Sequence, residues 1–193
     1  MTPTRRLSVR YLLWLALLVL AMALLPACGF ATTTTPAQGE QSGGGLAPDT
    51  VAKNFFEDLR AALKDMQLAN DDKRSKWVEQ LSNYFAPAER DDMRVTLSTA
   101  LDTFVDGLGK LASNEELTLD IQFDGIETVA NDGSRALVRP VNGSIYLLIT
   151  RTTDTGNVVK IWEQTDPLNK IIGNPDGAVP VIRIGRTWFL TED

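Results

Sequence analysis

The chain has 193 residues, a formal net charge of −6 and no histidine. Without histidine, the sequence excludes Ser-His-Asp and Cys-His catalytic arrangements and every histidine-ligated metal site. The single cysteine excludes an intramolecular disulfide framework and any multi-cysteine zinc or iron-sulfur site. The acidic balance argues against a nucleic-acid partner, because such a partner usually requires a basic surface. The length suits one domain with an additional segment for targeting or tethering.

The first 27 residues have the composition of a secretory signal peptide. Three arginines precede an uncharged and almost wholly apolar run of fifteen residues from Tyr11 to Leu25. This run is shorter than the roughly 20 residues that a helix needs to span a bilayer. A basic segment, a short apolar segment and a small residue before a break are typical of a cleaved signal, so we expect residues 1–27 to be removed.

The segment Leu25-Pro26-Ala27-Cys28 resembles the lipobox of bacterial lipoproteins. In that family the cysteine that follows a small residue is lipidated and becomes the new N-terminus. The resemblance therefore implies that Cys28 anchors the mature chain in the cell membrane, on the extracytoplasmic face. Two or more acyl chains anchor a protein stably, whereas one chain holds it only marginally. The alternative is an uncleaved signal anchor in which Cys28 has no role.

A run rich in Thr, Gly, Ser, Gln and Pro follows the cysteine. It contains one charged residue and almost nothing to bury, so we predict that residues 28–47 form a flexible linker. Residues 48–193 are predicted to form the folded domain. Residues 48–115 and residues 116–193 each carry a net charge of −4, so neither half indicates a basic patch for nucleic acid or anionic lipid.

The first part of the domain has helical periodicity. Asp49 and Thr50 are the N-cap candidates of a first helix, and Asp71-Asp72 opens a second helix. A third helix is predicted to begin near Pro87, and the acidic residues 89–92 complement the dipole of its first turn. A cation site at 89–92 is the alternative. The apolar face of the first helix comprises Val51, Phe55, Leu59, Ala62 and Met66.

From Glu116 onward the apolar period is two, which is typical of half-buried strands. Asp124-Gly125 is predicted to bend the first strand, and Asn142-Gly143 is predicted to form a hairpin turn with a positive φ at Gly143. Residues 166–177 are predicted to be a loop. Helices followed by strands favour an α+β domain in which amphipathic helices pack on a curved antiparallel meander. The residues predicted to be buried together are Leu97, Phe104, Leu119, Ile121 and Leu148.

The order of these elements, together with the final strand Gly185 to Leu190, resembles the nuclear transport factor two-like, or cystatin-like, superfamily. The resemblance covers about residues 49–192. It implies a cone-shaped sheet that curls around a helix and leaves an apolar pocket at its open end. A simpler helix-plus-meander fold is the alternative, because no short strand pair is evident between the early helices. The aromatic candidates for the pocket wall are Trp77, Tyr84, Phe85, Tyr146, Trp162 and Trp188.

The sequence leaves three classes of function open. The first is a non-enzymatic, membrane-anchored binding module for a small apolar ligand or another envelope protein. The second is a pocket enzyme of the isomerase or hydratase type, in which Asp120 or Asp124 acts with Tyr84 or Tyr146. The third is a structural or assembly role. The sequence contains neither a G-x-S-x-G motif nor a P-loop, and it predicts no catalytic residue, metal or cofactor.

Overall fold

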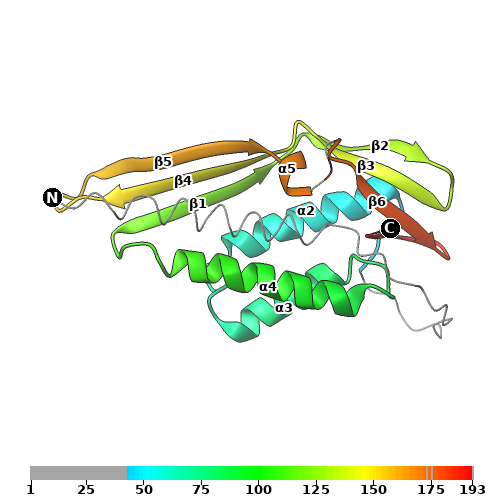
Figure 1. Ribbon diagram of the computed structural model, residues 1–193, viewed down its shortest axis with the longest axis horizontal. Helices are drawn as coiled ribbons and strands as arrows, with labels where there is room; N and C mark the ends of the chain where they lie inside the picture. The colour runs from blue at the N-terminus through cyan, green and yellow to red at the C-terminus, as the bar shows by residue number, and fades with distance from the viewer. Residues whose placement is uncertain (1–42, 173, 175, 193) are drawn as a thin grey trace.

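The structure, a computed structural model, describes residues 43–172, 174 and 176–192. It confirms the predicted α+β class, because three helices precede seven strands in the described part of the chain and lie on one side of them (Figure 1). The helices are α2 (Pro48–Lys64), α3 (Asp71–Ser82) and α4 (Arg90–Leu108). The strands are β1 (Glu115–Gln122), β2 (Gly125–Asn131), β3 (Arg135–Val141), β4 (Ser144–Thr152), β5 (Val158–Pro167), β6 (Val179–Ile184) and β7 (Thr187–Leu190). A fourth, short helix, α5 (Asn169–Ile172), lies between β5 and β6.

The strands form two antiparallel sheets, with the orders β1-β4-β5 and β2-β3-β6-β7. The first sheet ends where Gln122 faces Ser144, and the second begins where Gly125 faces Val141. The chain therefore crosses from one sheet to the other three times, from β1 to β2 and from β3 to β4 at this place, and from β5 to β6 through α5. All pairings are antiparallel, but consecutive strands pair only as β2-β3, β4-β5 and β6-β7. The bend between the two sheets lies at the expected Asp124-Gly125 position.

The predicted hairpin at Asn142-Gly143 is wrong. The strands β3 and β4 do not pair with each other, since β3 pairs with β2 and β6 while β4 pairs with β1 and β5. The positive φ belongs to Asn142 (52°) and not to Gly143. The Asn142 side chain donates Nδ2–H to Asp124 Oδ2 at 2.7 Å, which links the two crossings at the bend. An Asn-Gly pair favours a residue with a positive φ. Because β3 and β4 pair with strands of different sheets, the chain bends at this pair and does not reverse.

The helix α2 packs its apolar face against strands of both sheets. The predicted face is confirmed as far as Ala62, but Met66 is 97% exposed because the helix ends at Lys64. The helix begins with Ala47 at the N-cap and Pro48 at the first position, so the predicted caps Asp49 and Thr50 are wrong. Proline suits this position because the first helical N–H has no partner within the helix. The buried residues of α2 are Pro48, Val51, Ala52, Phe55, Phe56, Leu59 and Ala62.

Four of the five residues that were predicted to be buried together lie in the core or pack against it, and the exception is on β4. Leu97 and Ile121 are buried in the common core, and Phe104 and Leu119 pack against it partly buried. Leu148 lies on the opposite face of β4, so its prediction is wrong. The run from 145 to 149 is apolar at every position, so its sequence does not reveal which alternate residues face the helix. The buried residues of β4 are Ile145, Leu147 and Ile149.

The end of the predicted linker is part of the fold. Gly45 and Trp188 exchange two backbone hydrogen bonds, with N···O distances of 2.9 and 2.8 Å. A Cβ atom on Gly44 would lie 2.3 Å from Thr187 Cγ2 and 2.6 Å from Trp188 O, so this segment lies too close to β7 for any larger residue. The signal peptide, Cys28 and the rest of the linker lie outside the described residues. Among the residues described, no helix is long and apolar enough to cross a membrane.

Candidate functional site

The candidate site is a groove of about 390 Å³ at the bend of the sheet. Its lining residues come from the β3–β4 crossing and from the connection between β5 and β6. Figure 1 shows the short helix α5 in that connection. The volume of the groove lies within the range of small-molecule sites, roughly 300–1,000 Å³. The groove is lined by Arg139, Pro140, Gly143, Pro167, Leu168, Asn169, Ile172, Asp176 and Gly177.

Two glycines allow the walls of the groove to come close together. A Cβ atom on Gly143 would lie 3.0 Å from the Cβ atoms of both Leu168 and Pro140. Gly177 has a φ of +63°, and a Cβ atom there would lie 2.8 Å from Asn169 Cβ. The N–H of Leu168 donates to Gly143 O at 2.9 Å and joins the connection to the bend. Glycine is suited to both places because it has no side chain and tolerates a positive φ.

The groove combines an apolar floor with a polar rim. Leu168 and Ile172 are buried, and both belong to the main core. At the rim, Arg139 donates Nε–H to Glu127 Oε1 at 2.9 Å, and the backbone N–H of Asp176 donates to Asn174 Oδ1 at 3.0 Å. A guanidinium group has five N–H donors in a fixed fork, so Arg139 retains donors that Glu127 does not use. Asp176 also lines the groove, so the groove offers both a positive and a negative group to a small ligand above its buried apolar floor.

The aromatic residues predicted to line a pocket do not gather around this groove. Trp188, on β7, is buried in the main core. Trp162 packs half-buried against the same core from β5. Trp77, on α3, donates Nε1–H to Asp65 Oδ2 at 2.8 Å, and Phe85 is buried in the core. In the described structure these four side chains pack the domain.

The two tyrosines lie in different places. Tyr84 lies just after α3. Its hydroxyl donates to Asp58 Oδ2 at 2.6 Å, and Gln80 Nε2 donates to the same oxygen at 2.7 Å. Burial, reinforced by this bond to Asp58, raises the pKa of Tyr84 well above its usual range, so the hydroxyl stays protonated. Tyr146, on β4, donates to Glu163 Oε1 at 2.8 Å, and this bond also raises its pKa.

Neither predicted carboxylate forms a hydrogen bond with a tyrosine in the described structure. Asp120 faces Tyr146 in the β1–β4 register, but its carboxylate is ion-paired with Lys64 and accepts from Gln122 Nε2 at 3.0 Å. Asp124 accepts from the Asn142 amide at the bend. The tyrosines are bound instead to carboxylates that the sequence did not single out. These contacts join neighbouring elements, and none of them lies in the groove.

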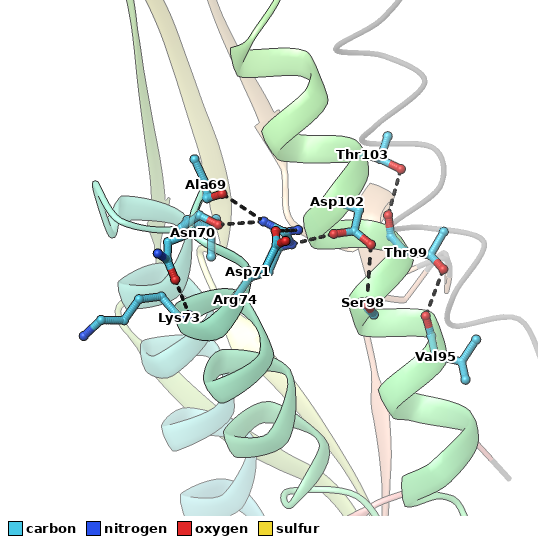
Figure 2. A network of polar contacts seen from close by, with 11 residues as sticks. Ala69, Asn70, Asp71, Lys73, Arg74, Val95, Ser98, Thr99, Asp102 and Thr103 are labelled. Atoms are coloured by element: carbon cyan, nitrogen blue, oxygen red, sulfur yellow. Dashed lines mark hydrogen bonds and ion pairs between the residues drawn. The ribbon is translucent and has the colours of Figure 1, made fainter.

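The densest polar network joins the helices (Figure 2). Arg74, on α3, donates Nη1–H to Leu68 O at 3.1 Å and Nη2–H to Asp71 Oδ1 at 2.6 Å. Its Nε lies 2.5 Å from Asp102 Oδ1 on α4, as Figure 2 shows. Arg74 therefore fastens the α2–α3 connection and the third helix to α3. The network contributes to packing, because the charged groups of Arg74, Asp71 and Asp102 are bound to one another or to backbone carbonyls.

Among the acidic residues at 89–92, Glu89 takes part in the packing of the domain. Glu89 Oε1 accepts from Thr191 Oγ1 at 2.6 Å, and its Oε2 accepts from the N–H of Glu192 at 3.1 Å. Asp91 is ion-paired with Arg94 one turn further along α4. These contacts attach the C-terminal segment to the start of α4. The described residues contain no group of three or more acidic, cysteine or histidine side chains that could hold a metal ion.

No protein-family model matches the chain, and a comparison with curated proteins finds no match. Function is therefore inferred from the N-terminal sequence and from the geometry of the described residues. The sequence did not predict the groove, because Gly143 was assigned to a hairpin and 166–177 to a simple loop. The sequence feature that could have indicated the groove is the concentration of Asn, Gly and Pro in that connection, because these residues permit a close approach of two backbones.

Proposed function

We propose that the chain is a membrane-anchored extracytoplasmic lipoprotein whose domain is a non-enzymatic module that binds a small ligand in the groove at the bend. The groove is the observation that carries the binding role, because it combines a suitable volume with a buried apolar floor and a guanidinium at its rim. The lipobox-like segment before the only cysteine supports the anchor. The similarity of the domain to the nuclear transport factor two-like superfamily is part of the same proposal.

The anchor is tested on the native protein by mass spectrometry. We expect the mature chain to begin at Cys28 and to carry acyl groups on that residue. The Cys28→Ala variant should lose lipid labelling and leave either an unprocessed precursor or a released form, while the domain keeps its fold. A mature N-terminus at any other residue, or an unmodified Cys28, would contradict the proposal.

The groove is tested with two fluorescent probes of similar size, 1-anilinonaphthalene-8-sulfonate and the uncharged N-phenyl-1-naphthylamine. We expect the full chain to bind both, because each aromatic body fits the apolar floor. Arg139→Gln should weaken binding of the sulfonate about tenfold, since charge-assisted hydrogen bonds contribute about 1.5–3 kcal/mol. The same variant should leave binding of the uncharged probe unchanged. Asn169→Trp should reduce binding of both probes by filling the groove.

The control for Arg139 is Arg94→Gln. Arg94 is also an ion-paired arginine, but it lies on α4 with Glu79 and Asp91 as partners, outside the residues that line the groove. Both substitutions remove one positive charge. Equal effects of the two variants on sulfonate binding would show that the probe does not bind in the groove and would overturn the proposed site.

The isomerase or hydratase alternative receives no support from the described residues. It required a tyrosine and an aspartate that converge on a pocket, and the tyrosines are bound to Asp58 and Glu163 away from the groove. The binding module is therefore the preferred function.

A further inference from the structure

Three arginines gather at the free end of the four-stranded sheet, where β2 turns into β3 and β6 turns into β7. We call Arg135, Arg183 and Arg186 the arginine tip. The backbone N–H of Arg183 donates to Ser134 O at 2.7 Å, and its Nη1–H donates to Gly133 O at 3.4 Å, so the two turns are held side by side. In Figure 1 this end of the sheet points away from the hairpin between β4 and β5.

The arginine tip is a local positive charge on an acidic domain. Residues 48–193 contain 16 basic and 24 acidic residues, a net charge of −8. The two turns, residues 131–136 and 183–188, contain the three arginines and one acid, Asp132, a net charge of +2. Asp132 Oδ1 accepts from the backbone N–H groups of Ser134 and Arg135 at 2.8 and 2.6 Å, so that carboxylate is already bound to the turn.

All three arginines are exposed. The Arg183 guanidinium donates to the backbone carbonyls of Gly133 and Gly185. Within the described part of the chain, none of the three arginines forms an ion pair with a carboxylate. Of the six other arginines in the domain, Arg60 and Arg90 donate to backbone carbonyls, and four are ion-paired with carboxylates. These are Arg74, Arg94, Arg139 and Arg151.

The N-terminal segment of the folded domain runs alongside the arginine tip. Gly45 pairs with Trp188, the second residue of β7, and the next residue, Leu46, is 89% exposed. Fifteen residues separate this segment from the proposed anchor, counting from Cys28 to position 42. Fifteen residues can span at most about 50 Å. An anchored chain would therefore keep this end of the domain within that distance of the membrane.

We infer that the arginine tip docks on the anionic phospholipid headgroups of the membrane that holds the Cys28 anchor, with Leu46 inserted at the interface; this inference rests on the proposed membrane anchoring. A basic residue near an anionic leaflet contributes about 1 kcal/mol, or about fivefold, so three arginines favour the docked state on the order of 100-fold. An exposed apolar side chain beside basic residues is typical of interfacial binding. The tip thus fixes which end of the domain faces the bilayer, and the groove lies at the bend, apart from that end of the sheet.

The inference is tested by hydrogen–deuterium exchange on the mature protein, purified from its host membrane and placed on vesicles at low salt. The vesicles contain phosphatidylcholine alone or phosphatidylcholine with one-third phosphatidylglycerol. On the anionic vesicles, exchange in residues 131–136 and 183–188 should slow by up to about 100-fold. The triple variant Arg135→Gln, Arg183→Gln, Arg186→Gln should remove this protection.

A matched control substitutes three exposed lysines of the helical part, Lys73→Gln, Lys76→Gln and Lys110→Gln. It changes the net charge by the same amount and should keep the protection. Equal exchange on the two vesicle types, or protection that survives in the arginine variant, would overturn the docking. Flotation of the vesicles in 1 M NaCl tests the anchor separately, because high salt screens the arginines but leaves acyl chains inserted. Protein that leaves the vesicles under that condition would refute the anchor, while the exchange at low salt still decides the role of the tip.

Discussion

The two ends of the bent sheet differ in how their outer strands are covered. At the four-stranded end, β7 is bonded on its free side by segments from the N-terminal half of the chain. Gly45 pairs with Trp188, and the N–H of Ala86 donates to Leu190 O at 2.8 Å. At the three-stranded end, β5 has only β4 as a strand neighbour in the described structure. Three apolar side chains there are exposed, namely Val158, Val159 and Ile161.

The two ends of the sheet therefore avoid unwanted strand pairing in different ways. The β7 edge of the four-stranded sheet is covered by the chain, whereas β5 relies on local features. The register between β4 and β5 shifts between Ile149 and Thr150, and Lys160 projects from the same part of β5. An irregular register and an edge lysine both oppose pairing with another strand. We therefore expect substitutions at the covered end to change stability, and substitutions on β5 to change solubility.

The largest effect is expected for Trp188→Ala at the covered end. Its side chain is only 6% exposed, so its removal should lower the free energy of unfolding by about 3–5 kcal/mol through lost burial and a cavity. Trp162→Ala, at the three-stranded end, should cost about 1–2 kcal/mol because that side chain is only half buried. Urea unfolding followed by circular dichroism measures both. Equal losses would contradict the proposed difference between the two ends.

A smaller loss is expected for Gly44→Ala. The new Cβ would lie 2.3 Å from Thr187 Cγ2 and 2.8 Å from Phe189 Cε1, so the segment would have to move off β7. We expect a loss of about 1–3 kcal/mol in the free energy of unfolding. Gly125→Ala is the matched control, because no atom lies within 4 Å of its Cβ position. If the two variants unfold at the same urea concentration, residues 43–47 do not stabilise the edge.

The three-stranded end should show a pH dependence that comes from Glu115. Arg151 donates Nε–H to Glu115 Oε1 at 3.1 Å, and the N–H of Ala112 donates to Oε2 at 3.1 Å. The bond from Arg151 is the main reason that the pKa of Glu115 is lowered from 4.5. A lowered carboxyl pKa contributes stability that is present above 4.5 and is lost as the pH falls through the folded value.

Glu115→Gln should therefore destabilise the protein by up to about 1 kcal/mol at pH 7. The difference from the unmodified protein should disappear at acidic pH, because Glu115 is then protonated in both the folded and the unfolded state. Unfolding curves at pH 7, 5 and 3 measure the difference. A loss that stays constant from pH 7 to pH 3 would mean that packing, and not the ion pair, is responsible.

The smallest effect on stability is expected for Ile161→Thr on the open edge. The side chain is exposed and threonine suits a strand, so the free energy of unfolding should change by less than about 0.5 kcal/mol. Light scattering at high protein concentration should nevertheless decrease, since the edge becomes less apolar. Unchanged scattering together with a clear loss of stability would show that β5 is covered in solution.

The sequence by itself predicted the elements that have an unambiguous period. The face of α2 up to Ala62 followed from the spacing of its apolar residues, and the bend at Asp124-Gly125 followed from the break in alternation. The class of fold followed from the order of helices and strands. These features depend on neighbours within about one or two turns of chain, which the sequence contains directly.

Tertiary structure decided the rest, because each remaining feature depends on segments that are distant in the sequence. The apolar run of β4 has no preferred face until α2 covers one of them. The glycines at 43–45, which resemble a linker in composition, become part of the fold only where β7 offers backbone partners. The groove requires Gly143 to meet the connection after β5.

The arginine tip is also a feature that the sequence alone does not predict, because its residues are distant from one another along the chain. Arg135 is 48 positions before Arg183, and each half of the domain sequence is acidic when its charges are counted. The pairing of β3 with β6 brings the three arginines together at one end. A charge count along the chain averages over the surface, whereas a membrane or a ligand responds to the local field of groups that lie within about 10 Å of one another. That local arrangement is determined by strand register, which only the folded chain defines.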